Sequence, residues 1–375
     1  MRSGVLPGIG LAVLLLLSVW AALFLTSINY AGGAEWPAPT LWLTIGARAV
    51  VLLIAMAAAG VLFAWSVLRN KRLGDTAKGL LTIPAAVLLC VLALEFAFMF
   101  VPRSHGYGAS LSARIWTSYY WHPLNDLGYR SAPVDFPAEG IKSVLVVGDS
   151  FTEGHGIKHI GDRYPELLGR KLGGDFQVFN AGQSGADSAM EYQNLLVYPV
   201  SPDILILQYF GNDIEYTCQD HGLTFGYFQP YRNLGRTATF IARNSFLVNF
   251  IYWLLPQTAE DIRYTDFLID CFHNEEVLKS HLDDLGQFVA FAQERHIPLY
   301  VVIFPFLEPE TEHVNYYVPL VSGFFRQKGI PVISVAELLQ GLGPAERMVN
   351  LSDGHASQKV HARVADALYA ELRNR

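Results

Sequence analysis

Cysteine and positive charge are both scarce in this sequence, and each shortage excludes a class of protein. The chain of 375 residues holds three cysteines, with no CxxC pair and no Cys/His cluster, which argues against the common zinc motifs. Residues 103–375 contain 21 basic and 31 acidic side chains, and this excess of negative charge disfavours binding to nucleic acid. We therefore expect no nucleic-acid partner, no metal site and no cofactor.

Three stretches almost without charge predict an N-terminal transmembrane region over residues 1–102. They run over about residues 8–26, 49–68 and 80–101. A hydrocarbon core about 30 Å thick needs about 20 apolar residues per helix, and all three stretches reach that length. Glu95 is the one acidic residue inside a span. It could serve as a proton site, or it could lie near the outer interface and face another helix or water.

The basic residues around these stretches predict how the chain is oriented. Arg69, Lys71, Arg72 and Lys78 crowd the loop between the second and third spans, whereas residues 27–46 hold no Lys or Arg. Because positive loops stay in the cytoplasm, we expect everything after Val101 to lie outside it. The first span could instead be a signal peptide cleaved near residues 31–34, which would leave the orientation of the rest unchanged.

After a lead-in over residues 103–141, apolar runs alternate with helical patterns from residue 142 to residue 375. The predicted strands are 143–147, 177–179, 204–208, 299–304 and 332–334, and the predicted helices are 163–172, 187–197, 278–295, 315–328 and 358–373. Such alternation predicts an α/β fold with a flavodoxin-like parallel sheet of about five strands. Ligands of these sheets bind at the carboxyl ends of the strands.

One segment, about residues 215–272, breaks this alternation and is predicted to be an insertion. Its apolar run 245–256 is too short to span a bilayer, so we expect a lid or a face that rests on the membrane. Cys218 and Cys271 flank the segment. A disulfide between them would close a loop of about fifty residues and contribute on the order of 4 kcal/mol. Two separate buried thiols are the alternative.

Four short motifs fall at the predicted carboxyl edge of the sheet or in loops that can reach it. They are Gly148-Asp149-Ser150, Asn180-Ala181-Gly182, Gly211-Asn212-Asp213 and Asp353-Gly354-His355. A serine at the end of a strand presents its hydroxyl at the open edge of the sheet. Each motif alone is also typical of ordinary turns and helix caps, so only their combination and order are informative.

In that order the four motifs resemble those of the SGNH (GDSL-like) hydrolase family, in a membrane-anchored, bacterial-type form, over about residues 142–375. The resemblance implies Ser150 as nucleophile, His355 as general base and Asp353 as the acid that orients the histidine. It also implies an oxyanion hole formed by the Ser150 N–H, the Gly182 N–H and the Asn212 side chain. In much of the family the acid lies three residues before the histidine, where this chain has Ser352.

Some other residues near these motifs allow more than one interpretation. His155 and His159, four apart, could share a helix face and bind a metal, although no HExxH motif surrounds them. His361 is expected to pack at the start of the last helix. The segment 125–130 (Asn-Asp-Leu-Gly-Tyr-Arg) resembles one that precedes the nucleophile strand in membrane-linked relatives, and it could equally be a turn leading into the sheet.

The sequence thus predicts a multi-pass membrane protein with an extracytoplasmic serine esterase domain. Its expected substrate is an O-acyl ester on a glycan, a lipid or a small molecule. An O-acyltransferase acting on a cell-surface glycan is one alternative, because transfer and hydrolysis share the same serine chemistry. A non-catalytic membrane scaffold or binding protein is the other, although a pure binder has no need of a nucleophile, a base and oxyanion donors.

Overall fold

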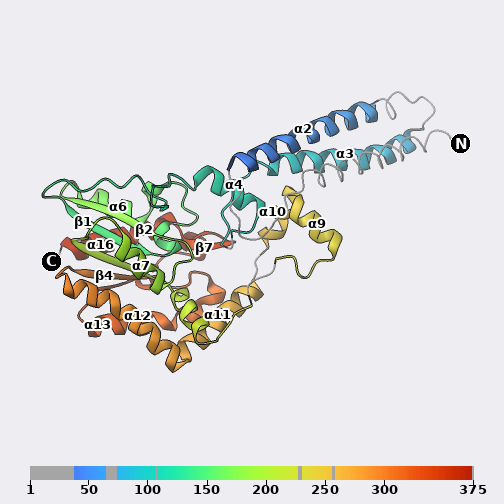
Figure 1. Ribbon diagram of the computed structural model, residues 1–375. Helices are drawn as coiled ribbons and strands as arrows, with labels where there is room; N and C mark the ends of the chain where they lie inside the picture. Colours follow the sequence, from blue (N-terminus) through green and yellow to red (C-terminus); the bar gives the residue numbers. More distant parts are fainter. Residues whose placement is uncertain (1–37, 65–73, 107, 227–229, 256–257, 374–375) are drawn as a thin grey trace. The chain divides into compact units, whose positions relative to one another are not determined.

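The computed structural model describes residues 38–64, 74–106, 108–226, 230–255 and 258–373 (Figure 1). The chain forms two compact units. The first comprises residues 1–103, 108–118 and 229–255, and the second comprises residues 104–107, 119–228 and 256–375. The predicted insertion is therefore shared, because its middle part belongs to the first unit.

In the first unit the described helices are α2 (Ala38–Phe63), α3 (Asp75–Phe98), α9 (Arg236–Asn244), α10 (Phe246–Leu254) and residues 111–118 of α4 (Leu111–Tyr120). Helices α2 and α3 pack side by side. Their shared core also includes Leu111 and Ile115 of α4 and Phe246 of α10. The other buried residues of this core are Leu41, Ile45, Leu52, Leu92 and Met99.

One of the described helices is long and apolar enough to cross a membrane, over Leu41–Val61, and a shorter apolar helix covers Thr82–Phe98. The predicted span 8–26 lies outside the described residues. The predicted span 49–68 overlaps α2, but the apolar stretch of that helix begins before Arg48. Arg48 can lie inside it because this side chain is buried and forms an ion pair with Glu95, with 3.8 Å between Nη1 and Oε1.

The second unit is built on a parallel sheet with the strand order β2-β1-β3-β4-β5, so the predicted five-stranded, flavodoxin-like sheet is confirmed. The strands are β1 (Lys142–Gly148), β2 (Phe176–Gly182), β3 (Ile204–Tyr209), β4 (Leu299–Ile303) and β5 (Val332–Ser334). Every strand end lies within three residues of its predicted position, and β5 has the predicted bounds. Nearly continuous apolar runs made them recognisable, because a strand covered on both faces needs apolar residues on both.

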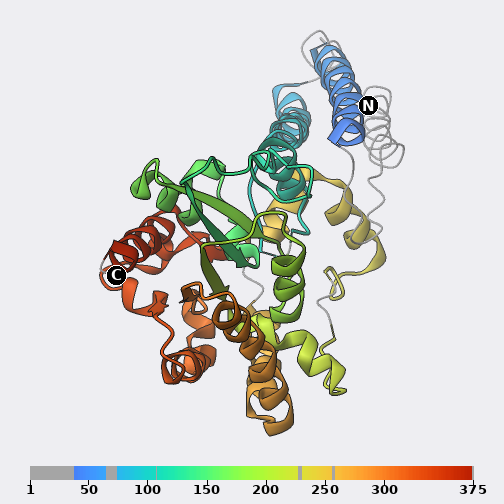
Figure 2. The same cartoon turned by 60° about the vertical axis from the view of Figure 1, so that its left-hand side comes forward.

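Helices cover both faces of this sheet (Figures 1 and 2). Leu145 and Val147 of β1 join the core under α7 (Ser188–Val197), α12 (Glu275–Glu294) and α13 (Tyr317–Gln327). Val144 and Val146 point the other way, into the core under α6 (Tyr164–Leu172), α14 (Val335–Leu338) and α16 (Gln358–Arg373). This alternation along one strand fixes which residues reach each layer.

The remaining elements of the second unit lie at the edge of the sheet or in the insertion. They are α5 (Ser150–Glu153), α8 (Glu215–Asp220), α11 (Thr258–His273), α15 (Pro344–Arg347) and the antiparallel pair β6 (Met348–Asn350) and β7 (Asp353–Ala356). A disulfide joins Cys218 of α8 to Cys271 of α11, with their Cα atoms 5.7 Å apart. It closes the base of the insertion where the chain leaves and re-enters the second unit.

Candidate active site

Ser150 begins the short helix α5 directly after β1, at the carboxyl edge of the sheet. Asp149 caps this helix by accepting a hydrogen bond from the Phe151 N–H at 2.8 Å. Gly148 is required here, because a Cβ would come within 2.4 Å of the side chains of Thr152 and Gln208. The tight turn keeps Ser150 only 8% exposed, with its hydroxyl directed toward the residues that follow β6.

The structure brings Ser150, His355 and Asp353 into one hydrogen-bonded series. The Ser150 Oγ lies 2.9 Å from His355 Nε2, and His355 Nδ1 lies 2.7 Å from Asp353 Oδ1. Both acid and base sit on β7, and the Asp353 side chain also accepts the His355 backbone N–H at 3.3 Å. The two-residue spacing thus still lets the carboxylate reach the imidazole from one strand.

The electrostatics of this series favour an ionised acid beside a proton-accepting histidine. Burial by itself lowers the pKa of His355, but the charge and hydrogen bond of Asp353 outweigh it and raise that pKa above its ordinary value. Burial raises the pKa of Asp353, but His355 more than offsets this, so that pKa lies well below its ordinary range. Asp353 therefore stays charged and holds the proton of His355 on Nδ1.

The predicted oxyanion donors do not all have a free hydrogen. Within the described residues, neither the Ser150 N–H nor the Asn212 side chain forms a hydrogen bond, so both can donate to a substrate oxygen. The Gly182 N–H is already donated to Asn180 Oδ1 at 2.9 Å. A Cβ at Gly182 would lie 2.3 Å from the Glu153 nitrogen, so this glycine serves close packing behind the nucleophile turn. The expected role of Gly182 as a donor therefore does not fit this geometry.

Gly185 follows in the same loop and has the features that Gly182 lacks. Its φ of +79° lies in the left-handed region, and nothing is within 4 Å of the place where a Cβ would stand. No hydrogen bond engages its N–H in the described part of the chain. A substrate can therefore approach this stretch of backbone closely.

His155 is a second histidine at the site. Its ring stacks against that of His355, with centroids 4.4 Å apart, and its Nε2 lies 3.8 Å from Asp353 Oδ2. Burial lowers the pKa of His155 to about 4, with a smaller contribution from His355, so the ring is neutral near pH 7. The His105 carbonyl lies 3.2 Å from the same Nε2, which indicates that this nitrogen carries the proton.

Metal binding by His155 together with His159 was one interpretation of the sequence. In the structure, His155 lies beside Asp353 and His355 instead. Among the described residues, His155, Asp353 and His355 form the group whose ligand atoms lie within 4.8 Å of one another. His355 already bonds to Asp353 through Nδ1 and to Ser150 through Nε2, an arrangement suited to proton transfer. The His159 ring packs edge-on against Tyr120 instead. His361 packs as expected, with its ring stacked on Tyr164 and Nδ1 accepting the Tyr164 N–H at 3.2 Å.

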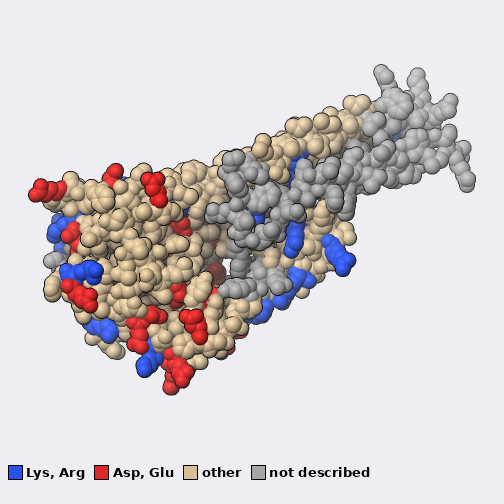
Figure 3. All heavy atoms as spheres, in the orientation of Figure 1, with Lys and Arg blue, Asp and Glu red and all other residues tan. Residues whose placement is uncertain are grey.

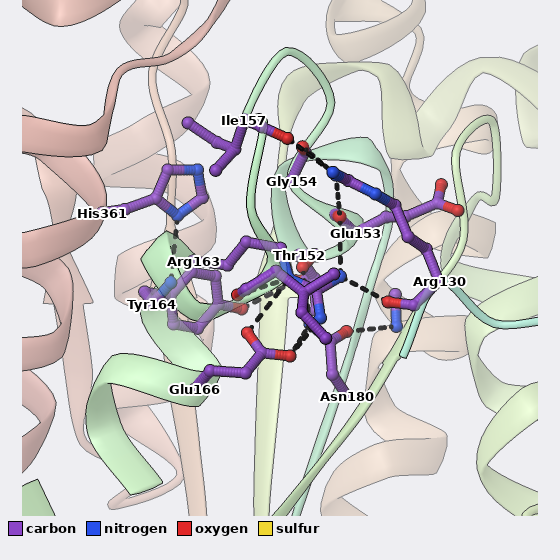
Figure 4. A network of polar contacts seen from close by, with 12 residues as sticks. Arg130, Thr152, Glu153, Gly154, Ile157, Arg163, Tyr164, Glu166, Asn180 and His361 are labelled. Atoms are coloured by element: carbon purple, nitrogen blue, oxygen red, sulfur yellow. Dashed lines mark hydrogen bonds and ion pairs between the residues drawn. The ribbon is translucent and has the colours of Figure 1, made fainter. Parts of the chain in front are cut away.

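The segment 125–130 places Arg130, whose side chain holds the loop after Ser150 (Figure 4). The guanidinium of Arg130 is buried and donates to the carbonyls of Gly154 at 2.8 Å and Ile157 at 2.6 Å. Arg163, also buried, donates to the Glu153 carbonyl at 3.0 Å and to the Arg130 carbonyl. The two arginines thereby fix the loop that carries His155. The sequence motif marked this segment but not its purpose.

Three buried carboxyl groups lie beneath the site: Asp149, Glu191 and Asp213. Burial, followed by the charges of Asp213 and Asp149, raises the pKa of Glu191 well above its ordinary value. Burial likewise raises the pKa of Asp149 to about 6. Within the described chain, neither carboxylate oxygen of Glu191 has a hydrogen-bond partner. Such groups hold a proton more readily than exposed carboxyls do.

A pocket of about 680 Å³ lies beside the base, lined in part by Phe306, Glu308, Glu312, Gln340 and Arg347. Glu308 packs directly on Gly354, the residue between Asp353 and His355, because a Cβ there would collide with its carboxylate. Phe306 likewise packs on Gly211, next to Asn212. The pocket thus borders the residues next to both His355 and Asn212.

Comparison with known proteins gives low similarity. No family model matches the chain, and no curated protein matches it. Two solved structures of lipolytic G-D-S-L proteins, from Desulfitobacterium hafniense DCB-2 and Veillonella parvula DSM 2008, are each 13% identical. They cover 61% and 62% of this chain, and 98% and 99% of their own, with TM-scores of 0.38 and 0.34. A carbohydrate esterase structure, also 13% identical, covers 65% of this chain and 68% of its own, with a TM-score of 0.29. With scores this low, the functional argument rests on the geometry of the site.

Proposed function

We propose that this chain is a membrane-anchored serine esterase that hydrolyses O-acyl esters through an acyl-serine intermediate. The observation that carries the proposal is the hydrogen-bonded series Ser150–His355–Asp353, with contacts of 2.9 Å and 2.7 Å. A serine hydroxyl is a weak nucleophile unless a base accepts its proton, and the base needs an acid to hold its tautomer. All three groups are present in the order that this chemistry requires.

In the proposed reaction, Ser150 Oγ attacks the ester carbonyl and its proton passes to His355 Nε2. The tetrahedral oxyanion accepts hydrogen bonds from the Ser150 N–H and the Asn212 amide, and we assign the third donor to the Gly185 N–H in place of Gly182. Collapse breaks the ester C–O bond, and the alcohol leaves with the proton from His355. Water then attacks the acyl-serine while His355 takes its proton, and the carboxylic acid is released as Ser150 regains its hydrogen. Each oxyanion donor contributes about 2.7–4 kcal/mol to such a transition state.

The pocket beside the base can hold a polar alcohol partner, such as a sugar. Its carboxylates Glu308 and Glu312, with Gln340 and Arg347, can bond to hydroxyl groups, and Phe306 offers an apolar face. The same pocket favours a second candidate, an O-acyltransferase, because a glycan hydroxyl held there would replace water in the second step.

We also propose that the catalytic unit lies outside the cytoplasm. The candidate span Leu41–Val61 supports an anchor, and the basic residues between Arg69 and Lys78 support a cytoplasmic position for that loop. The disulfide between Cys218 and Cys271 supports an oxidising compartment. A reporter fused after Arg375 that works only in the cytoplasm would contradict this orientation.

A fluorophosphonate probe tests the nucleophile. The full-length protein in detergent should become labelled on Ser150, and Ser150→Ala should lose both the label and ester hydrolysis. Ser352→Ala, next to the acid, is the matched control and should keep both. An active Ser150→Ala protein would defeat the proposal. Adding an acyl ester together with a glycan acceptor, and measuring free acid against acylated glycan, separates hydrolysis from transfer.

A further inference from the structure

Helix α10 has two unlike faces. Phe246, Asn249 and Trp253 are buried within the first unit. The opposite face is apolar yet exposed: Val248 is 37% exposed, Ile251 51%, Leu254 47%, and Leu255, just after the helix, 61%. Residues 245–255 contain no charged side chain. Water is a poor environment for such a face, so its surroundings need an explanation.

Hydrogen bonds hold the amino end of α10 to the helix pair α2 and α3, which contains the candidate span. Glu95 of α3 accepts hydrogen bonds from Ser245 Oγ at 2.6 Å, the Phe246 N–H at 2.8 Å and the Leu247 N–H at 3.0 Å. Its carboxylate also pairs with Arg48 of α2. A negative group at a helix amino terminus is favourable because the free N–H groups and the helix dipole both point at it. These contacts hold the amino end of α10 against the proposed membrane anchor.

The buried face of α10 is closed by a specific polar network. Asn249 accepts the Leu111 N–H at 2.8 Å and donates to the Ala242 carbonyl and the Tyr231 hydroxyl, each at 2.9 Å. The Trp253 indole also donates to the Tyr231 hydroxyl at 2.9 Å. With the inner side fixed in this way, the helix cannot roll to hide its apolar outer residues, and their exposure is built in.

The charged side chains carried by residues 229–255 all have one sign. Residues 229–255 hold Arg232, Arg236 and Arg243 and no acidic residue, and the other charged residues of the first unit after Val101 are Arg103 and Arg114. Figure 3 shows basic side chains gathered around α9. Basic residues beside an apolar helix face, with Trp and Tyr close by, are typical of segments that lie in the headgroup layer of a membrane.

We propose that α9 and α10 form an interfacial hairpin, in which the exposed face of α10 (Val248, Ile251, Leu254 and Leu255) is inserted into the bilayer surface among anionic lipid headgroups. The inference rests on the proposed membrane anchor and adds a second, shallow contact to it. The apolar face of such a helix sits about 5–10 Å into the boundary between headgroups and acyl chains.

Depth-dependent quenching tests the hairpin in the full-length protein. The exposed Cys90 is first replaced by serine, and a fluorophore is attached at Ile251→Cys or, in a separate protein, at Ile54→Cys in the candidate span. In vesicles with roughly one third anionic phosphatidylglycerol, a nitroxide near the top of the lipid chain should remove about half of the fluorescence at position 251. Arg232→Gln with Arg236→Gln should weaken that quenching and its dependence on anionic lipid.

The label at position 54 separates the two proposals. Quenching at 54 without quenching at 251 would overturn the hairpin and leave the anchor standing, whereas loss of quenching at both positions would overturn the anchor itself. Efficient disulfide formation between two copies of the Ile251→Cys protein, without quenching, would mean that a second copy covers this face and would also overturn the inference.

Discussion

The two units of this chain differ in charge and in how they use the charges they bury. The first unit has 11 basic and 3 acidic residues, and the second has 16 basic and 31 acidic residues. In the first unit the buried Glu95 accepts three hydrogen bonds and has an arginine beside it. In the second unit Glu191 is buried with neither oxygen bonded, in the part of the chain described. A fully bonded buried charge fixes structure, whereas an unbonded one holds its charge poorly and responds to pH.

If the chemistry belongs to the second unit alone, its largest effects should come from the histidine and its acid. His355→Ala should lower kcat by roughly 10⁴-fold or more, and Asp353→Asn by roughly 10³–10⁴-fold, because the 2.7 Å contact makes Asp353 an effective orienter. Asp366→Asn, on the surface, should have no effect. Steady-state kinetics on a soluble acyl ester measures this. An Asp353→Asn protein of near-normal activity would show that the strand β7 holds the base unaided.

The dependence of activity on pH tests the same pair, His355 and Asp353. His355 must be neutral to accept a proton, so activity is lost as pH falls through its pKa, which lies above the ordinary value of 6.5. Removing the charge of Asp353 lowers that pKa, so the acid limb of kcat/KM in Asp353→Asn should move to lower pH. A limb that stays in place would mean that another group titrates.

The clamp at Glu95 tests whether the units are energetically separate. Glu95→Leu should destabilise the first unit by about 3–5 kcal/mol, because the buried charge of Arg48 loses the carboxylate that compensates it. Trypsin should then cut faster after Arg232, Arg236 or Arg243. Labelling of Ser150 should persist, and Asp75→Asn at the exposed start of α3 should change nothing. Loss of Ser150 labelling together with the faster cleavage would refute the separation.

A smaller effect is expected at Arg130, which belongs to the second unit but touches no reacting atom. Arg130→Met removes a side-chain donor from the carbonyls of Gly154 and Ile157 and loosens the loop that carries His155. Because small displacements at an active site cost about 10²-fold, kcat/KM should fall by about 10- to 100-fold. Arg170→Met is the surface control. Unchanged kinetics would assign Arg130 to stability alone.

The last effect should be a gain in stability rather than a loss. Burial raises the pKa of Glu191 in the folded state, so the stability contributed by its protonated form is present below the ordinary pKa near 4.5 and is lost as pH rises above it. Glu191→Gln has no ionisable group at this position, so its stability does not fall with pH for this reason. Its free energy of unfolding should therefore exceed that of the unaltered protein by up to about 1.4 kcal/mol per pH unit above that value. The exposed Glu294→Gln is the control, and a gap that does not widen with pH would disprove the assignment.

Much of the second unit could be read from the sequence because its determinants are local. A buried parallel strand must be a continuous apolar run, and Ser150 lies in a short motif directly after such a run. His355 lies in a short motif just before the last helix. Residues whose roles depend on distant contacts could not be predicted. His155 reaches the base only through the turn at Gly154 and Gly156, and Glu95 meets α10 150 residues later in the chain. The Gly182 motif was recognisable, but only the structure shows its N–H bonded to Asn180.

The clamp between Glu95 and α10 also means that the two units are interleaved along the gene. Residues 229–255 complete the first unit, yet they are encoded between two halves of the second. A soluble fragment begun after Val101 would keep α10 while losing Glu95, Arg48 and the apolar residues that cover Phe246. Such a fragment should aggregate unless 229–255 is replaced by a short linker across the Cys218–Cys271 bridge. During synthesis, α3 is likewise completed long before the ribosome delivers its partner, so the first unit reaches its final form only after three of the five sheet strands have been made.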